Sequence, residues 1–291
     1  AVHYPFQPAK RHEGRYAKSE VKRPETMANT EQNYLTQSHW IRERRYSIHG
    51  VDHMETGPYD NDPVPSFDDL YRGYCETLYG LDENIGRVLD YLDESGLSRS
   101  TLVVYMGDNG FALGEHGFYD KRDAFEESIR VPMLAYAPGL IEPGTRITQM
   151  VQNIDIAPTL LDAAGIETPP SAKMDGRSFL PFLSGGSTPW RDHILYEYHW
   201  EWNFPATPTV FAIRTERYKY VFYHGVWDRD GFYDLQTDPR ERYNLIDVPS
   251  CQDQIRTLQE KLFDELEASG GLNIRVQRPL GERLDQRKNR R

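Results

Sequence analysis

The sequence lacks several features that mark specialised classes of protein. It has only two cysteines among 291 residues, Cys75 and Cys251, so no disulfide framework is implied. No apolar run approaches the roughly 20 residues that a membrane-spanning helix needs, and no signal peptide is visible. The net charge of -11 argues against a general nucleic-acid binder, which needs a basic surface. An anionic substrate stays compatible with that charge, because a bound metal ion reverses the field inside a single cleft.

The composition is that of an ordinary globular protein. Hydrophobic residues make up 38% of the chain and charged residues 27%, which leaves enough apolar material for a core. The length predicts one large α/β unit and a smaller appendage. We place the boundary at the glycine-rich linker Leu183–Ser187, which divides the chain into residues 1–186 and 187–291.

The spacing of apolar residues predicts the elements of the first part. After a polar stretch over residues 7–64, Ser66 is a plausible N-cap for a helix that ends at Gly96. The apolar run Thr101–Met106 is typical of a strand covered on both faces, as in a parallel sheet. A second strand over Val131–Ala137 and a helix over Asp155–Ala164 complete a doubly wound α/β pattern.

The second part has a different organisation. Short strand candidates are followed by one amphipathic helix near residues 255–266, which predicts a small antiparallel β subdomain with one packed helix. The strand candidates are His193–Tyr198, Thr209–Arg214, Tyr218–Tyr223 and Gly231–Leu235.

Candidate site residues follow the first apolar strand. Asp108 and Asn109 come directly after it, and ligands of open α/β sheets bind beyond the carboxyl ends of strands. A carboxylate beside an amide oxygen suits Ca²⁺ or Mg²⁺, although a turn is the simpler interpretation of these residues alone. Lys121 and His116 lie in the next loop and His3 lies near the start. Each of these three, taken singly, is an ordinary surface or structural residue.

Nine stretches in order along the chain form a recognisable pattern: Val2–Pro8, Val104–Gly110, Gly114–Gly117, Asp120–Lys121, Glu126–Pro132, Asp155–Leu161, Asp175–Gly176, Phe232–Glu241 and Asn244–Leu245. Together they resemble the type I sulfatases of the alkaline phosphatase superfamily, in family order and over nearly the whole chain.

The resemblance implies a role for each matching residue. Asp108 and Asn109 match two metal ligands, usually for calcium, with Mg²⁺ as the alternative. Lys121 matches the lysine that contacts the sulfate, and His3 matches the histidine near the leaving-group oxygen. His116 sits in a matching motif, which implies contact with the substrate or support for the ligands. The activity implied is calcium-dependent hydrolysis of sulfate esters.

One part of the family pattern is missing. The family's nucleophile is a formylglycine made within a Cys/Ser-x-Pro-x-Arg motif, near an Asp-Asp pair that supplies two further metal ligands. Neither cysteine fits the motif; Ser187–Arg191 fits formally but lies in the linker, and Asp68–Asp69 falls in a predicted first helical turn. Calcium needs about six to eight oxygen ligands. We therefore expect an N-terminally truncated part of an enzyme, inactive alone, with the formylglycine in the missing segment.

The substrate expectation comes from the aromatic stretch over residues 197–208. Aromatic faces with polar edges suit sugar rings, whereas packing within the subdomain is the alternative. The stretch resembles those of sulfatases acting on N-acetylglucosamine-6-sulfate or on mucin and glycosaminoglycan sugars, so we expect His199 and Trp200 to contact a sulfated glycan. The competing readings are a phosphodiester or phosphonate hydrolase and a non-catalytic glycan-binding fragment. The family resemblance implies a periplasmic, secreted or lysosomal protein.

Overall fold

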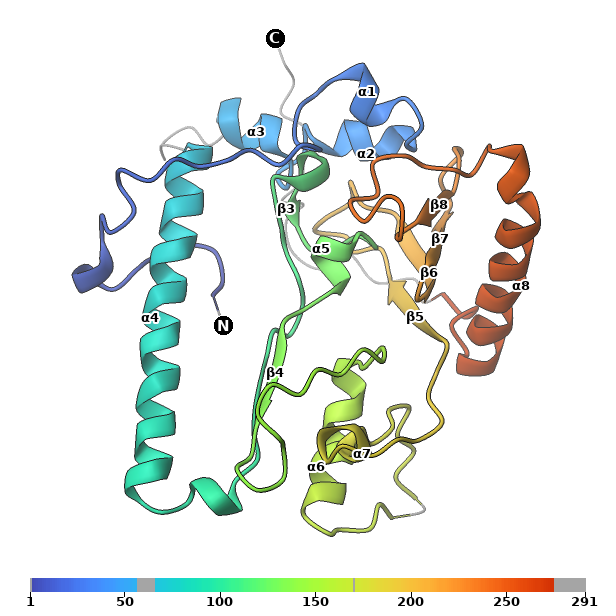
Figure 1. Ribbon diagram of the computed structural model, residues 1–291. Coiled ribbons are helices and arrows are strands. Elements are labelled where there is room, and N and C mark those ends of the chain that lie inside the picture. Colours follow the sequence, from blue (N-terminus) through green and yellow to red (C-terminus); the bar gives the residue numbers. More distant parts are fainter. Residues whose placement is uncertain (1, 57–65, 170, 275–291) are drawn as a thin grey trace. The chain divides into compact units, whose positions relative to one another are not determined.

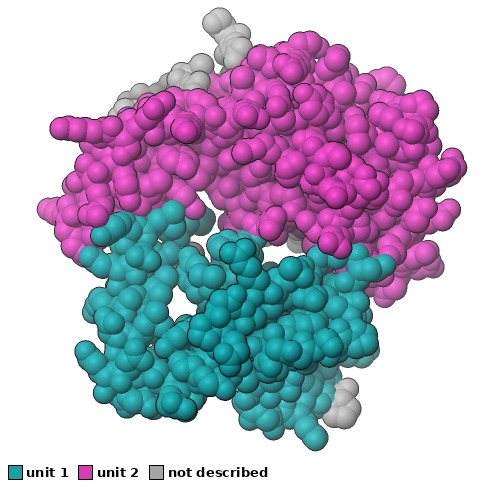
Figure 2. All heavy atoms as spheres, viewed as in Figure 1, with its two compact units in different colours: residues 1–3, 78–108, 131–192 teal, residues 4–77, 109–130, 193–291 magenta. Residues whose placement is uncertain are grey.

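The computed structural model describes residues 2–56, 66–169 and 171–274, which form two compact units (Figure 2). Unit 1 comprises residues 1–3, 78–108 and 131–192, and unit 2 comprises residues 4–77, 109–130 and 193–291. The units alternate along the chain, and the division at residues 186 and 187 stays a prediction. Among the described residues, no helix combines the length and apolarity that crossing a membrane requires.

The helix predicted after Ser66 is confirmed as α4, Phe67–Glu94. The Asp69 amide donates to Ser66 Oγ at 3.2 Å, which is the expected N-cap contact. At the other end, Gly96 has a φ of +73° and the Leu97 amide donates to Leu92 O, as in a Schellman motif. The acidic pair Asp68–Asp69 therefore lies in a first helical turn, as expected.

Unit 1 is built on a two-stranded sheet. Strands β1 (Val103–Met106) and β4 (Met133–Tyr136) pair antiparallel, so the parallel pairing that the apolar run favoured is not found within the described residues. The core of this unit is a cluster of three buried residues, Phe179, Phe182 and Leu183. Met133 and Ala135 of β4 pack against it. The two other residues of β4, Leu134 and Tyr136, are 67% and 44% exposed.

The last segment of unit 1, which leads into β5, is fixed by one buried carboxylate. Asp155 is 0% exposed and pairs with Arg191, whose Nη2 donates to Asp155 Oδ1 at 2.7 Å. Ser187–Arg191 thus forms part of a linker after helix α7 (Leu180–Leu183), where the sequence placed it. The remaining unit 1 elements are η2 (Ser98–Ser100), η4 (Asn153–Asp155) and α6 (Ile156–Ala163).

Unit 2 contains the predicted antiparallel subdomain. Its sheet has the order β5-β6-β7-β8, and α8 (Gln252–Ser269) lies beside it (Figure 1). The strands are β5 (His193–Tyr198), β6 (Thr209–Thr215), β7 (Tyr218–His224) and β8 (Gly231–Asp234). Both the strands and the packed helix are confirmed.

The two faces of this sheet have different partners. One face packs against α8, through a core that includes Phe211, Ile213, Leu258 and Leu262. Residues of the opposite face, including Val210 and Val221, join a core formed by the loops after β1 and the N-terminal helices. The C-terminal sheet therefore serves as the platform for the loops that carry Asn109 and Lys121.

The remaining elements of unit 2 are short. They are η1 (Lys10–His12), α1 (Glu31–Tyr34), α2 (His39–Arg44), α3 (Val51–Thr56), β2 (Ala112–Leu113), η3 (Glu115–Gly117), β3 (Tyr119–Asp120), α5 (Glu126–Ile129) and η5 (Pro249–Cys251).

Candidate functional site

Asn109 and Lys121 are brought together by a small hairpin. Strands β2 and β3 pair antiparallel, with Ala112 opposite Asp120, so the residues that flank the hairpin meet. The Lys121 ammonium donates to Asn109 Oδ1 at 3.0 Å, and both side chains are partly buried. Two residues that lie twelve positions apart in the sequence thus form one polar pair.

The backbone next to Asn109 is fixed by a close approach at Gly110. The Gly110 amide donates to Ser128 O at 2.9 Å, and Asn109 Nδ2 donates to Gly110 O at 2.6 Å. A Cβ atom at position 110 would lie 2.8 Å from Ser128 O and closer still to Glu127 O, where a real Cβ essentially never lies. Only glycine fits here without a backbone shift, which explains the glycine after Asp108–Asn109.

Asp108 and His3 both belong to unit 1, and both are exposed. Asp108 directly precedes Asn109, so a carboxylate and an amide oxygen lie on successive residues of one loop. Lys121 belongs to unit 2, and the convergence of His3 with Lys121 stays a prediction.

The donor set fits part of a calcium site. Carboxylate and amide oxygens are the hard ligands that Ca²⁺ prefers, and Asp108 and Asn109 supply them. Two residues fall short of six to eight oxygens. Within the described ranges, no group of three or more His, Cys, Asp or Glu residues is arranged to hold a metal ion. The remaining ligands would have to come from elsewhere.

His116 is held by structural contacts. It is 4% exposed, and its ring stacks on Phe125 at 3.7 Å between centroids. The His116 amide donates to Thr26 Oγ1, and its carbonyl accepts from the Tyr34 hydroxyl. Its Nε2 lies 3.7 Å from a carboxylate oxygen of Glu127, in the segment that contacts Gly110. These contacts favour support of the site, and contact with a substrate stays a prediction.

A buried charged cluster includes both sequence neighbours of Lys121. Asp120 is 1% exposed and pairs with both Arg44 and Arg122, the latter at 2.7 Å. The Nη1 of Arg44 also lies 3.5 Å from Asp123. Burial, followed by the charges of Arg44 and Arg122, lowers the pKa of His49 to about 3, so this ring is neutral near pH 7.

The aromatic stretch contacts this cluster through Arg122. The Arg122 Nε donates to Glu201 Oε1 at 3.0 Å, and its guanidinium lies 3.7 Å from the centroid of the Phe204 ring. Trp200, in the same stretch, contacts its own subdomain, and its backbone amide donates to Thr209 Oγ1. The Nδ1 atom of His199 is buried and makes no hydrogen bond within the described residues. The loop of His199 and Trp200 is thereby tied to the neighbour of Lys121.

Several of these residues were missed from the sequence. Arg44 and His49 lie in the polar stretch whose periodicity is weak, and nothing local marks them as buried. Arg122 carried one signal, its place directly after Asp120 and Lys121. The acidic residue within the aromatic stretch, Glu201, carried another.

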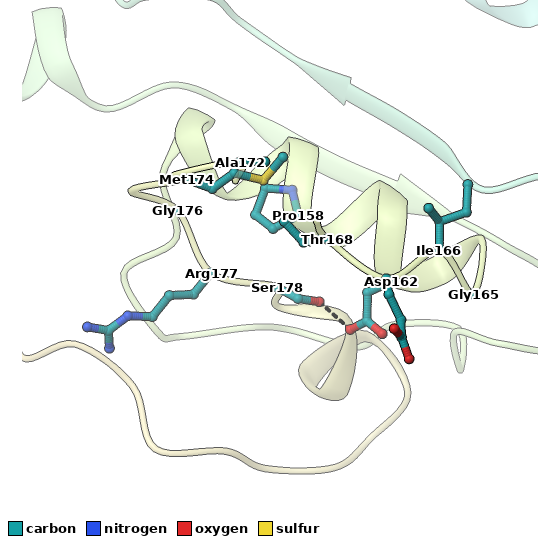
Figure 3. A pocket seen from close by; sticks show the side chains of 11 residues that line it. Pro158, Asp162, Gly165, Ile166, Thr168, Ala172, Met174, Gly176, Arg177 and Ser178 are labelled. Carbon is teal, nitrogen blue, oxygen red and sulfur yellow. Dashed lines mark hydrogen bonds between the residues drawn. The ribbon is translucent and has the colours of Figure 1, made fainter. Parts of the chain in front are cut away.

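A separate hollow lies in unit 1 and contains none of the predicted site residues. It is lined by residues of α6 and of the following loop, including Pro158, Met174 and Arg177 (Figure 3). The hydroxyl of Ser178 donates to Asp162 Oδ2 there at 2.6 Å. Of the described residues that line it, Arg177 alone is cationic.

Family models match the chain along most of its length. The model of the sulfatase family matches residues 1–166, and a model for the C-terminal region of N-sulphoglucosamine sulphohydrolase matches residues 114–268. The chain belongs to the sulfatase family. The resemblance of its motifs to type I sulfatases is thereby confirmed.

Individual relatives agree with the family models. An N-acetylglucosamine-6-O-sulfatase of Bacteroides thetaiotaomicron is 39% identical over 180 residues, which cover 60% of this chain and 31% of the relative. The multifunctional alkaline phosphatase superfamily protein PehA of Trinickia caryophylli is 31% identical over 234 residues, covering 73% of this chain and 45% of that protein. The chain thus spans less than half the length of these relatives.

Solved structures confirm the fold. The structure of a protein bound to its substrate D-glucosamine-2-N,6-O-disulfate aligns with a TM-score of 0.81 and 26% identity, covering 94% of this chain and 65% of that one. A phosphonate monoester hydrolase of Agrobacterium radiobacter aligns with a TM-score of 0.68 and 24% identity, over 84% and 50% of the two chains. The alkaline-phosphatase-like fold expected from the sequence is therefore confirmed.

Proposed function

We propose that this chain is part of a sulfuric ester hydrolase that removes sulfate from an amino sugar of the N-acetylglucosamine-6-sulfate class. The observation that carries the proposal is the contact between Lys121 and Asn109, which meet at the positions where the family places a sulfate-contacting lysine and a metal ligand. Relatives named as N-acetylglucosamine-6-sulfatases and the neighbour bound to a glucosamine disulfate support the substrate class.

The chemistry needs charge stabilisation at a defined place. A sulfate ester carries spread negative charge, and its cleavage pushes more charge onto the bridging oxygen. Lys121, held by Asn109, donates to a sulfate oxygen with little reorganisation, because its ammonium is already oriented. His3 gives a proton to the departing sugar oxygen, a step worth about 10²–10⁴-fold. Overall, the bond between sulfur and the sugar oxygen breaks, water supplies the oxygen that replaces it at sulfur, and the products are the free sugar hydroxyl and hydrogen sulfate.

Asp108 and Asn109 would hold calcium, with magnesium as the alternative. A divalent ion bound there supplies Lewis-acid stabilisation of the sulfate oxygens. The chain's own share of that site is two ligands, so we expect residues 1–291 alone to bind calcium weakly.

We also infer that the nucleophile lies outside this chain, as a formylglycine in a segment that precedes it in the full-length protein. Neither Cys75 nor Cys251 has the required motif around it. The outward residues of β4, Leu134 and Tyr136, are exposed although large and apolar, which suits a strand that packs against further protein. We accordingly expect residues 1–291 alone not to hydrolyse sulfate esters.

We propose that the sugar binds to the aromatic stretch over residues 197–208. Phe204 and Trp200 offer apolar faces, while Glu201 and Arg122 offer hydrogen-bonding edges next to Lys121. This combination suits a sugar ring whose sulfate reaches Lys121, with His199 as a further contact. The ligand would be a sulfated sugar of a glycosaminoglycan or mucin glycan in the periplasm, the secreted fraction or the lysosome, and not a nucleic acid.

A second candidate is hydrolysis of phosphodiesters or phosphonate monoesters. The similarity to PehA, described as multifunctional, favours it because the same lysine and metal ligands stabilise a phosphoryl group equally well. Charge alone does not separate the two reactions.

Substrate comparison in the full-length gene product tests the proposal. N-acetylglucosamine-6-sulfate, bis(4-nitrophenyl) phosphate and phenyl phenylphosphonate are offered at equal concentration, and released sulfate, nitrophenolate or phenol is measured. We expect kcat/KM to be highest for the sulfated sugar. Higher values for either phosphorus ester would establish the second candidate. Glycan binding without turnover, unaffected by Lys121→Ala, would instead show a non-catalytic binding protein.

A further inference from the structure

A buried lysine of the C-terminal sheet is tied to the site loop. Lys219, on β7, is 0% exposed, and its ammonium donates to Ala124 O at 2.7 Å. It also lies 2.9 Å from Glu126 Oε1 and 2.8 Å from Glu241 Oε1. The ammonium thus has one carbonyl acceptor and two carboxylate partners within ion-pair distance. Because a buried charge is tolerated only when it is fully paired, the ammonium fixes the positions of all three acceptors.

A second set of contacts fixes the same segment. Glu241, also fully buried, accepts the Glu126 amide on its other carboxylate oxygen at 2.7 Å. The Glu241 carbonyl in turn accepts from Gln37 Nε2 at 3.0 Å. Arg214 on β6 donates to Glu126 Oε2 at 3.1 Å. The start of α5 is therefore held by its backbone and by its side chain.

The segment after Ala124 then contacts the residue next to Asn109. Ser128 O accepts the Gly110 amide, and Glu127 O occupies the space where a Cβ of Gly110 would lie. Asn109, directly before Gly110, accepts from Lys121. A shift of the segment 124–128 would move the backbone that orients the Asn109 side chain.

We propose that Lys219 is a positioning residue for the Asn109–Lys121 pair and acts through the segment 124–128. The contacts of Lys219 are to Ala124, Glu126 and Glu241, so it acts through these residues. The C-terminal subdomain is thereby more than a packing partner, because its central hairpin sets the geometry of the sulfate-contacting lysine. The kinetic consequence of this role rests on the proposed sulfatase function, whereas the structural consequence does not.

The test uses two variants and one matched control. Lys219→Met removes the ammonium and leaves Glu241 without its partner, so it is expected to weaken folding as well. The double variant Lys219→Met with Glu241→Met removes the buried ion pair and fills its space, and Glu126 keeps Arg214 as its partner. The contacts of Lys219 to Ala124 and Glu126 and the bond from the Glu126 amide to Glu241 are lost. Arg217→Met on the same hairpin removes a half-exposed guanidinium, which pairs with the mostly buried Asp234 and not with the segment 124–128, and serves as the control.

The structural readout is amide hydrogen exchange in residues 1–291. In the double variant, exchange at Gly110 should become at least about tenfold faster, while exchange at Ala212 in the middle of β6 stays within about twofold of wild type. The control should leave both unchanged. Unchanged exchange at Gly110 in the double variant would overturn the proposal, even if the full-length protein is a sulfatase.

The kinetic readout uses the full-length protein and separates positioning from stability. A lost transition-state contact lowers kcat and leaves KM nearly unchanged. We expect the double variant to unfold at a higher temperature than Lys219→Met alone. At a temperature where it is fully folded, it should still lose at least about tenfold in kcat, with KM within about threefold. Recovery of wild-type kcat together with wild-type stability would overturn the kinetic role. If no sulfate ester is turned over, the proposed function fails while the exchange result at Gly110 still decides the structural role.

Discussion

Replacing Gly110 by alanine should release Asn109 from the backbone that holds it. The added methyl would lie 2.8 Å from Ser128 O and closer still to Glu127 O, whereas ordinary Cβ contacts lie at 3.4–4 Å. Both obstacles are backbone atoms, so the loop must move. Overpacking of this kind costs about 1–3 kcal/mol, and loss of the hydrogen bond between Gly110 and Ser128 costs about 1 kcal/mol more. The free energy of unfolding should therefore fall by about 2–4 kcal/mol.

Urea denaturation of residues 1–291, followed by circular dichroism, measures this change. Gly86→Ala is the matched control, because Gly86 lies within α4 and an added Cβ would meet nothing within 4 Å. Alanine there should stabilise the protein by about 0.5–1 kcal/mol. If Gly110→Ala unfolds at the same urea concentration as wild type, the close approach at Gly110 does not constrain this loop and the reasoning fails.

Three further predictions concern stability. Ser66→Ala removes the N-cap of α4 and should lower the free energy of unfolding by about 1 kcal/mol in the same urea assay, and a neutral effect would refute the capping role. Burial lowers the pKa of His49 to about 3, below its value in the unfolded chain. The stability that depends on the neutral ring is therefore fully present above pH 6.5 and is lost as the pH falls through 3. The free energy of unfolding should fall with decreasing pH by at most about 1.4 kcal/mol per pH unit from this residue. His49→Gln should reduce that slope in urea titrations between pH 7 and pH 4, and equal slopes for the variant and wild type would contradict this. Leu262→Ala, at a fully buried position of α8, should cost about 2–5 kcal/mol, whereas exposed Glu260→Ala should stay within about 0.5 kcal/mol, and equal effects would show that α8 does not anchor the sheet.

Local sequence patterns were sufficient for the elements that depend on local physics. The helix α4 has an N-cap at Ser66, a periodic apolar stripe and a glycine stop, and each of these signals is independent of the rest of the chain. The strands of the C-terminal sheet alternate with turns at short spacing, so neighbours in sequence are neighbours in the sheet. Both predictions needed no knowledge of distant segments.

The pairing of β1 was beyond such reasoning. An apolar run reports that both faces of a strand meet apolar surroundings, but it does not identify the neighbouring strand. Within the described residues that neighbour is the antiparallel β4, from a segment nearly thirty residues later. The expectation of a parallel neighbour rested on the typical case, which the local sequence alone does not decide.

Local sequence likewise indicated some residues of the candidate site and missed those that depend on distant segments. Asn109 and Lys121 were chosen because motif order carried them, and the structure joins their side chains by a hydrogen bond, while their roles stay predictions. Arg44 escaped notice because a charged residue in a polar stretch is expected at the surface, and only the long-range pairing with Asp120 makes its burial favourable. His49 escaped notice for a related reason, because its partly buried neutral ring depends on distant neighbours. The positions of Asp108 and His3 relative to Lys121 stay predictions.

The central claim is that the Lys121 ammonium, oriented by Asn109, stabilises the charge of a sulfate ester. The most direct measurement is kcat/KM of the full-length protein on N-acetylglucosamine-6-sulfate for wild type, Lys121→Ala and the exposed control Lys10→Ala. Loss of one such fixed electrostatic contact costs about 10²–10³-fold in rate, so Lys121→Ala should fall by that factor while Lys10→Ala keeps the wild-type value. Equal kcat/KM for all three proteins would contradict the account.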